Sequence, residues 1–147
     1  MEERTGAAAV RRFNEEAPWG EVPSLFGLEV LELERDRVRG RIPVTERLIA
    51  GTGVLWAPVV VALADALCAA GTGANVLEGA SFTTVELKTN FLGTARPGEA
   101  IVGEATPAHI GRTTQVWDVT VTNETTGRTL ALQRCTQMVL YLSLIHI

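Results

Sequence analysis

The chain has 147 residues, of which 46% are hydrophobic and 20% are charged, and its formal net charge is -4 at pH 7. This length fits one domain, and this balance excludes a disordered chain and a fibrous repeat. An acidic chain is also a poor partner for nucleic acid, because neutralising phosphates requires a basic surface.

The sequence predicts neither a membrane span nor an export signal. The apolar run over 54–64 stops at Asp65, well short of the roughly 20 residues that a span requires. The acidic residues at the start lack the apolar stretch of a secretory signal, and two cysteines far apart predict no disulfide framework. We therefore expect a cytoplasmic protein.

Two elements are predicted ahead of the longest apolar run. Residues 5–17 have a helix-forming composition and stop before Pro18, which predicts a short helix followed by an irregular stretch to Pro23. Residues 26–34 and 37–44 are rich in β-branched and aliphatic residues on either side of a two-residue turn, which predicts a β-hairpin.

The central helix is predicted to begin at Pro58, a residue that suits the first helical position, and to end near Gly71. Asp65 is the one charged side chain between residues 48 and 75. A helix that is apolar on nearly all sides must be buried on nearly all sides. Since a sheet can cover one face, we expect a second copy of the chain to cover the other, in a homodimer or homotetramer.

Four more strand-like stretches follow, separated by glycine, proline or asparagine. They cover 81–92, 99–106, 113–122 and 129–141. In the first, strict alternation predicts one shared face made of Thr83, Val85, Leu87, Thr89 and Phe91. Together with the hairpin and the helix, these strands predict an α+β fold with an antiparallel sheet of about six strands around one long helix.

The chain divides into three parts on these patterns. Residues 1–25 form an N-terminal helix and lead-in, 26–141 form a single domain, and 142–147 form a separate tail. The tail resembles the translation of a sequencing adapter, so we leave it out of the fold prediction. The alternative is a natural apolar extension of the last strand.

Asp65 is the main candidate for chemistry. Burying a carboxylate on an apolar helix is costly because desolvation disfavours its charged form, and such groups are often functional. Asp65 lies seven residues after Pro58, about 10 Å along a helix. The free N–H groups at the helix start can stabilise an oxyanion. The alternative is a structural aspartate held by nearby hydroxyl or N–H groups.

Three stretches together resemble the hotdog-fold thioesterases, in the branch with the phenylacetate-pathway and 1,4-dihydroxy-2-naphthoyl-CoA thioesterases. The first is 27–44 and the second is 56–65. The third consists of two segments, 85–98 and 107–119. The resemblance implies a hotdog fold. It also implies an enzyme that hydrolyses an acyl-CoA or aryl-CoA thioester without a cofactor or metal.

The resemblance also assigns roles on the central helix. The family commonly has His-Gly-Gly, six residues, then Asp or Glu, and Trp56, Ala57 and Pro58 occupy the triplet with Asp65 in register. Asp65 would act as general base or nucleophile, and the Ala57 N–H would face the thioester oxygen. The family's histidine is replaced by Trp56. Two further positions that are usually polar hold small apolar residues, Ala50 and Ala69.

The segment from His109 to Thr113 matches the family's stretch beside the CoA nucleotide. Gly111 would let the backbone approach, while Arg112 and Thr113 would donate to phosphate oxygens. Arg96 is a weaker candidate for the same contact. The alternative for these side chains is an ordinary solvated turn, with His109 hydrogen-bonded inside it.

Other sites are disfavoured by the sequence. Cys68 lies between apolar residues, so we interpret it as a small buried side chain. The glycine pairs at 51/53 and 71/73 are interpreted as loops, since neither matches a nucleotide-binding pattern. A non-catalytic acyl-CoA binding protein is the alternative function, favoured by Trp56. A hotdog dehydratase would need a catalytic histidine, and His109 is the one histidine before the tail.

Overall fold

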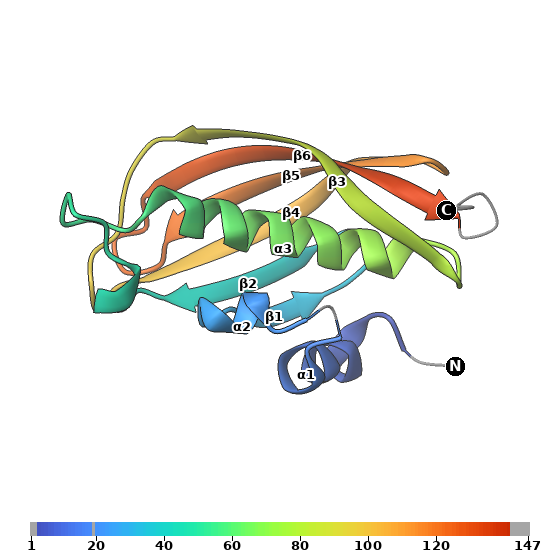
Figure 1. Ribbon diagram of the computed structural model, residues 1–147, viewed down its shortest axis with the longest axis horizontal. Helices are drawn as coiled ribbons and strands as arrows, with labels where there is room; N and C mark the ends of the chain where they lie inside the picture. The colour runs from blue at the N-terminus through green and yellow to red at the C-terminus, as the bar shows by residue number, and fades with distance from the viewer. Residues whose placement is uncertain (1–2, 19, 142–147) are drawn as a thin grey trace.

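A computed structural model describes residues 3–18 and 20–141 (Figure 1). Its helices are α1 (Gly6–Glu16), α2 (Val22–Leu25), the 3-10 turn η1 (Glu46–Leu48) and α3 (Ala57–Asn75). Its strands are β1 (Glu29–Leu33), β2 (Val38–Pro43), β3 (Ala80–Phe91), β4 (Ala100–Ile110), β5 (Thr114–Asn123) and β6 (Thr129–Tyr141). The predicted tail over 142–147 lies outside the described residues.

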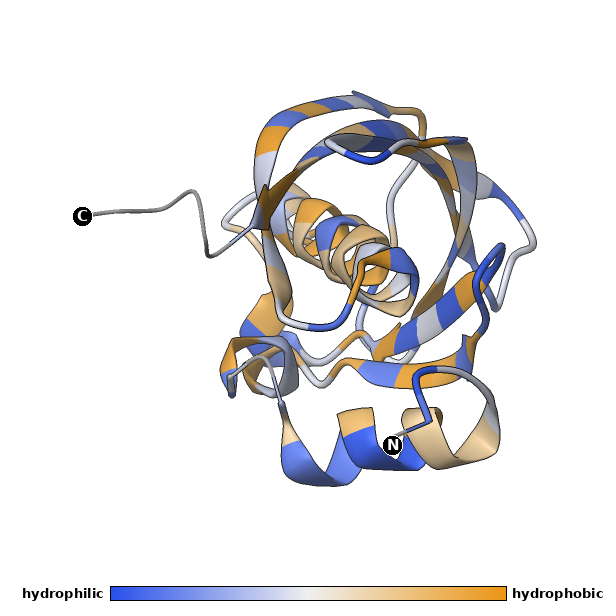
Figure 2. Cartoon of the chain, turned by 90° about the vertical axis from the view of Figure 1, so that its right-hand side faces the viewer, coloured by the Kyte–Doolittle hydropathy of each residue, from blue (hydrophilic) through white to orange (hydrophobic). Residues whose placement is uncertain are grey.

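The six strands form one antiparallel sheet in the order β1-β2-β4-β5-β6-β3. The sheet curls around α3, which lies along its concave face, and α1 packs outside beside β1 (Figure 2). β1 and β3 are therefore the two free edges. This arrangement confirms the predicted α+β fold with a long helix inside a six-stranded sheet.

The lead-in differs from its prediction in two details. A short helix, α2, occupies part of the stretch predicted to be irregular. The first strand starts at Glu29 and not at Phe26, because Gly27 turns the chain at a φ of +76° between α2 and β1. The hairpin turn after β1 is as predicted, with the Glu34 N–H donating to the Arg37 carbonyl at 2.8 Å.

The predicted end of the central helix is wrong. α3 continues through Gly71 and Gly73 to Asn75, so the 71/73 pair does not form a loop. A Cβ at Gly71 would lie 2.4 Å from Cη2 of the fully buried Trp117. Glycine in a helix costs about 1 kcal/mol relative to alanine, and here it makes room for the large indole ring of β5.

The predicted face of β3 is wrong ahead of a bulge and correct after it, where Leu87 and Thr89 still share the inner face. The pairing of β3 with β6 shifts between Thr84 and Glu86, so a bulge breaks the alternation. Ahead of the bulge Thr84, and not Thr83, faces the helix, and after it Leu87 pairs with the buried Cys135.

α3 is long and apolar enough to cross a membrane by length and composition alone. However, 56% of an apolar 18-residue stretch of this helix is buried inside the structure, and Leu63 and Leu67 are fully buried. Leu67 packs so closely on the sheet that a Cβ at Gly103 would lie 2.6 Å from its Cδ1. We therefore assign α3 to the core of the domain.

Candidate active site

Asp65 lies near the middle of α3 on the side that faces β3 and β6. It is half-buried, and its Oδ1 accepts a hydrogen bond from the Thr84 hydroxyl at 2.9 Å. The thiol of Cys135 on β6 approaches the same oxygen at 3.7 Å. The carboxylate is thus held on one oxygen by side chains from two strands.

Gln137 on β6 fixes the direction of this hydrogen bond. Its Nε2 donates to Thr84 Oγ1 at 2.9 Å and lies 3.1 Å from the Cys135 sulfur. Because Thr84 accepts from Gln137, its hydroxyl proton is available for Asp65. Among the described residues no hydrogen bond engages Asp65 Oδ2, so this oxygen is left for chemistry.

Thr84, Cys135 and Gln137 were not predicted from the sequence. The bulge in β3 concealed Thr84, since alternation placed its neighbour on the inner face. One signal was present in β6, where the inward positions include Gln133, Cys135 and Gln137 and all three are buried. Polar side chains on the inner face of an apolar strand indicate a hydrogen-bonded site.

The helix start holds the second predicted part of the site. Trp56 is the N-cap residue of α3, is 53% exposed, and donates its N–H to the Leu48 carbonyl at 2.9 Å. Ala57 and Pro58 are exposed beside it. The first N–H groups of a helix have no partner inside the helix, so the Ala57 N–H has none within α3.

A single chain does not bring Asp65 and Ala57 onto one carbonyl group. They are eight residues apart on a continuous helix, a separation of about 12 Å. A reacting carbonyl must lie about 3 Å from both its attacking group and its oxyanion donor. The two groups can therefore act together only when they come from different copies.

The turn between β4 and β5 carries the predicted CoA contacts. The Gly111 N–H donates to the Thr114 carbonyl at 2.8 Å, and a Cβ at Gly111 would lie 2.5 Å from His109 Nε2. The Tyr141 hydroxyl donates to the Arg112 carbonyl. Arg112 and Thr113 are exposed, and no hydrogen bond to another described residue engages the Arg112 guanidinium.

Arg96 lies at the opposite end of the sheet from Arg112. It follows Ala95, whose carbonyl accepts from Leu55 beside the start of α3. Its backbone N–H donates to Glu99 at 2.8 Å, and this bond, with one from Asn123, lowers the pKa of Glu99. Since β4 has 11 residues and spans roughly 35 Å, one chain cannot bring both arginines to one phosphate.

Cys68 is buried, as predicted, and does not have the character of a nucleophile. Its hydrogen bond with Cys135 and its burial raise the pKa of the thiol, so it stays protonated. Within residues 3–18 and 20–141, no group of three His, Cys, Asp or Glu side chains is placed to hold a metal.

Comparison with known proteins identifies the family. The model of the thioesterase superfamily matches residues 52–130. The chain is similar to the 1,4-dihydroxy-2-naphthoyl-CoA hydrolase of Listeria monocytogenes, at 29% identity over 111 residues that cover 76% of this chain and 89% of that protein.

Comparison with solved structures also shows similarity to a thioesterase and to a protein with the same fold. Thioesterase HI1161 from Haemophilus influenzae superposes with a TM-score of 0.85 at 26% identity, covering 98% of this chain and 96% of that one. The PaaI protein of E. coli shares the fold with a TM-score of 0.77 at 18% identity, covering 87% of this chain and 90% of that one.

The chain therefore belongs to the thioesterase superfamily. It is an enzyme, a thioesterase-type hydrolase with the hotdog fold. Both conclusions agree with the resemblance found in the sequence.

Proposed function

We propose that the protein hydrolyses an acyl-CoA or aryl-CoA thioester to the free acid and CoA, with Asp65 as the catalytic carboxylate. The observation that carries the proposal is the hydrogen bond from Thr84 to Asp65. It fixes the carboxylate of the one charged residue of α3 through Oδ1, while Oδ2 has no hydrogen bond to another described residue. This is the arrangement that a general base or nucleophile needs.

Relatives support a CoA thioester as the substrate. The similar Listeria monocytogenes protein is named as a 1,4-dihydroxy-2-naphthoyl-CoA hydrolase. The Streptococcus mutans protein smu.793, which has the same fold at 23% identity and a TM-score of 0.71, was crystallised bound to acetyl CoA. We place the CoA phosphates of this chain's substrate beside Arg112, whose guanidinium can donate two hydrogen bonds to phosphate oxygens.

The chemistry follows from the free oxygen of Asp65. As a general base, Oδ2 takes a proton from water while the water oxygen attacks the thioester carbonyl. The C–S bond then breaks, and the CoA sulfur leaves with the proton that Asp65 returns. As a nucleophile, Asp65 would displace CoA as the thiolate and form an acyl anhydride, and water would then open the anhydride to the free acid and restore the carboxylate. In both routes the carbonyl oxygen gains negative charge and needs an N–H donor.

A second copy of the chain supplies that donor in our proposal. β3 is a free edge, and apolar side chains on it and just after it are exposed: Val85, Leu87, Phe91 and Leu92. An exposed apolar edge strand favours pairing with another strand. Antiparallel pairing of two β3 edges would place two α3 helices side by side, with the partner subunit's Ala57 N–H serving Asp65.

The test measures thiol release from a panel of acyl-CoA and aryl-CoA esters by wild type and Asp65→Asn. The amide has the volume of the carboxylate but can neither attack nor accept a proton. We expect a loss of about 10²–10⁴ in kcat, the range for a general base, with an unchanged melting temperature. Equal turnover by the two proteins would refute the role of Asp65.

The alternative, a non-catalytic acyl-CoA binding protein, is favoured by Trp56 in place of the family's histidine. It predicts that wild type binds CoA esters but releases no thiol from any of them. In that case Trp56→His restores the missing polar group, and a gain of turnover would show that the pocket is complete except for this side chain.

A further inference from the structure

β1 has no neighbouring strand on its outer side, and a side chain of α1 binds the backbone there. Asn14 Nδ2 donates to the Val30 carbonyl at 2.9 Å, and the Val30 N–H donates to Asn14 Oδ1 at 2.8 Å. Two residues of neighbouring antiparallel strands exchange the same pair of hydrogen bonds. The amide of Asn14 thus takes the place of a residue in an adjacent strand.

Other features of β1 also oppose pairing with a further strand. The strand has five residues, and its pairing with β2 shifts between Val30 and Glu32. The lining of the groove between β1 and α1 includes four carboxylates and one arginine: Glu15, Glu29, Glu32, Glu34 and Arg11. Short length, bulges and charged side chains all discourage pairing of an edge strand. β1 is therefore a protected edge, and Asn14 is the side chain that bonds directly to its backbone.

β3, at the other edge of the sheet, has the opposite character. It has 12 residues, and Val85 and Leu87 are exposed. A chain that pairs through one edge stops at two copies, because the pair leaves only protected edges. A chain that pairs through both edges continues to add copies and forms an open-ended array. Protection of β1 therefore sets the size of the assembly.

α1 depends on its contacts with the rest of the protein. It has 11 residues, and its N-cap residue Thr5 makes no side-chain capping hydrogen bond. Its first turn has no acidic residue and its last turn has no basic residue, so neither end carries a charge that complements the helix dipole. Isolated helices shorter than about 12–15 residues are marginal in water. We therefore expect α1 to detach when its contacts are removed.

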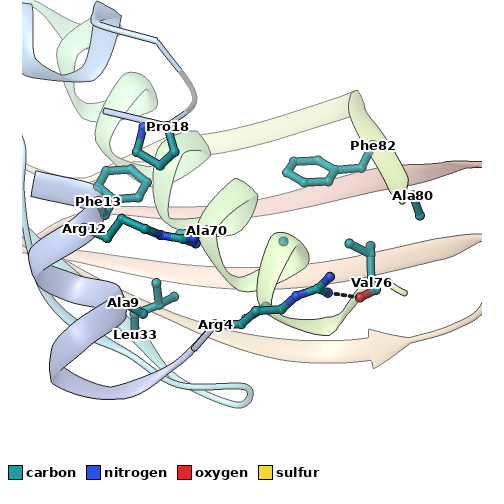
Figure 3. Close-up of a pocket in the computed structure, with 12 residues that line it drawn as sticks. Arg4, Ala9, Arg12, Phe13, Pro18, Leu33, Ala70, Val76, Ala80 and Phe82 are labelled. Carbon is teal, nitrogen blue, oxygen red and sulfur yellow. Dashed lines mark hydrogen bonds between the residues drawn. The ribbon is translucent and has the colours of Figure 1, made fainter. Parts of the chain in front are cut away.

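The packing of α1 on the core is incomplete. Ala9 is buried and Phe13 packs against the core. A hollow of about 230 Å³ nevertheless lies between α1 and the C-terminal half of α3, where Ala9 and Phe13 line one side and Ala70 lines the other (Figure 3). Space that side chains do not fill forfeits dispersion contacts. The two hydrogen bonds of Asn14 are therefore a substantial part of the attachment of α1 to β1.

We propose that α1, through Asn14, masks the β1 edge as a second surface for self-association. When the mask is removed, the occupant of this edge is the β1 strand of another copy, which offers the same backbone groups for antiparallel pairing. The mask thus confines self-association to β3. This inference does not depend on the catalytic role of Asp65.

The test measures the mass of wild type and Asn14→Ala by light scattering over a range of protein concentrations. Alanine favours a helix more than asparagine does, so the substitution removes two hydrogen bonds without weakening α1 itself. The measurements use about 1 M NaCl, which screens the carboxylates of the groove because the Debye length falls to about 3 Å. We expect a constant mass for wild type. For Asn14→Ala we expect a mass that grows with concentration to at least about twice the wild-type value.

Two further variants separate this edge from other surfaces. Glu16→Ala is the matched control, because Glu16 is exposed on α1 and does not line the groove, and it should keep the wild-type mass. Leu31 is 38% exposed on β1, and burial of a lysine between paired strands is unfavourable. Leu31→Lys combined with Asn14→Ala should therefore restore the wild-type mass.

Equal masses for wild type and Asn14→Ala at every concentration would overturn the inference, as would a wild-type mass that itself grows. Association of Asn14→Ala that Leu31→Lys fails to reverse would also overturn it, because another surface would then be responsible. If Asn14→Ala shows no cooperative melting, Asn14→Asp decides. It keeps the acceptor for the Val30 N–H and loses only the donor, and it should also form larger assemblies than wild type.

Discussion

The hydrogen bonds around Asp65 form a chain in which the donors and acceptors of each side chain fix the direction of the next hydrogen bond. Gln137 has a donor that Thr84 accepts, and Thr84 has one proton, which it gives to Asp65. The burial of Gln137 protects this order from competition by water. Such a chain holds a carboxylate in one rotamer, and orientation of a reacting group accounts for much of catalytic rate.

Thr84→Val should therefore lower kcat by about 10- to 150-fold, because one hydrogen bond to a charged group is worth roughly 1.5–3 kcal/mol. The two side chains have nearly the same shape, so the KM for a CoA ester should change by less than about twofold. Steady-state thiol release measures both constants.

Thr84→Ser is the rescue variant, because it restores the hydroxyl without the methyl group. It should recover most of the kcat lost in Thr84→Val. A Thr84→Ser enzyme as slow as Thr84→Val would show that the residue acts through packing and not through its hydrogen bond to Asp65.

At the scale of elements, the turn between β4 and β5 has a tightly packed backbone. Gly111 admits no Cβ next to His109, and Tyr141 and Val139 of β6 bind the carbonyls of Arg112 and Thr113. The backbone of the turn is thus fixed while the Arg112 side chain is exposed. A fixed backbone with an exposed guanidinium favours binding of a phosphate.

Arg112→Ala should weaken the binding of CoA esters by roughly 1.5–3 kcal/mol, the range for charged hydrogen bonds. An acyl-pantetheine thioester lacks the nucleotide and should bind wild type and variant equally. Arg35→Ala, in the exposed turn of the first hairpin, is the control. Equal losses on both substrates would assign Arg112 to the acyl site or to folding.

The outer face of the sheet carries ion pairs that link neighbouring strands. Arg134 of β6 donates two hydrogen bonds to Asp118 of β5, at 2.6 and 2.7 Å. These bonds, with the charge of Arg134, lower the pKa of Asp118. Both side chains are about half exposed, so their contribution to stability is small.

Folding lowers the pKa of Asp118. The contribution of its ion pair with Arg134 to stability is therefore present above the unfolded pKa of Asp118, about 3.9, and is lost as the pH falls through its pKa in the folded protein. Asp118→Asn should lower the melting temperature slightly at pH 7. The difference between variant and wild type should shrink as the pH falls below about 3.9 and disappear once Asp118 is protonated in the folded protein, as measured by thermal unfolding. A difference that persists in acid would indicate a packing effect of the substitution.

At the scale of the whole molecule, the sequence predicted the architecture because its strongest signals are periodic. The apolar run around Asp65 and the strands broken by turn residues define a helix inside a sheet. The errors come from packing that no local pattern encodes. Gly71 remains helical because Trp117 lies against it, and Thr84 replaces Thr83 because a bulge shifts β3.

The candidate site was predictable only in part for the same reason. Asp65 stands out as a charge in an apolar helix, whereas Thr84, Cys135 and Gln137 come from strands that follow it by 19 to 72 residues. Their contact with Asp65 depends on strand order and register, which one sequence does not reveal. In the proposed mechanism the site also needs an N–H donor, and the same chain holds the Ala57 N–H about 12 Å away, so the mechanism requires an assembly of two copies.

The central claim, a thioesterase site shared between two copies, is tested by mixing two inactive variants. Asp65→Asn removes the carboxylate, and Ala57→Pro removes the N–H. Proline is tolerated at the first helical position, and Trp56 already has the extended backbone, with φ of -64° and ψ of 123°, that a following proline requires. Each variant alone should form a folded dimer that releases little thiol.

Refolding the two variants together produces mixed dimers, in which one site carries both defects and the other carries none. Thiol release from an acyl-CoA should then recover to about a quarter of the wild-type rate, since random mixing makes half of the dimers mixed and each has one intact site of two. If Asp65 and Ala57 of the same chain acted together, every site in the mixture would hold a defect. No recovery of activity in verified mixed dimers would contradict the shared site.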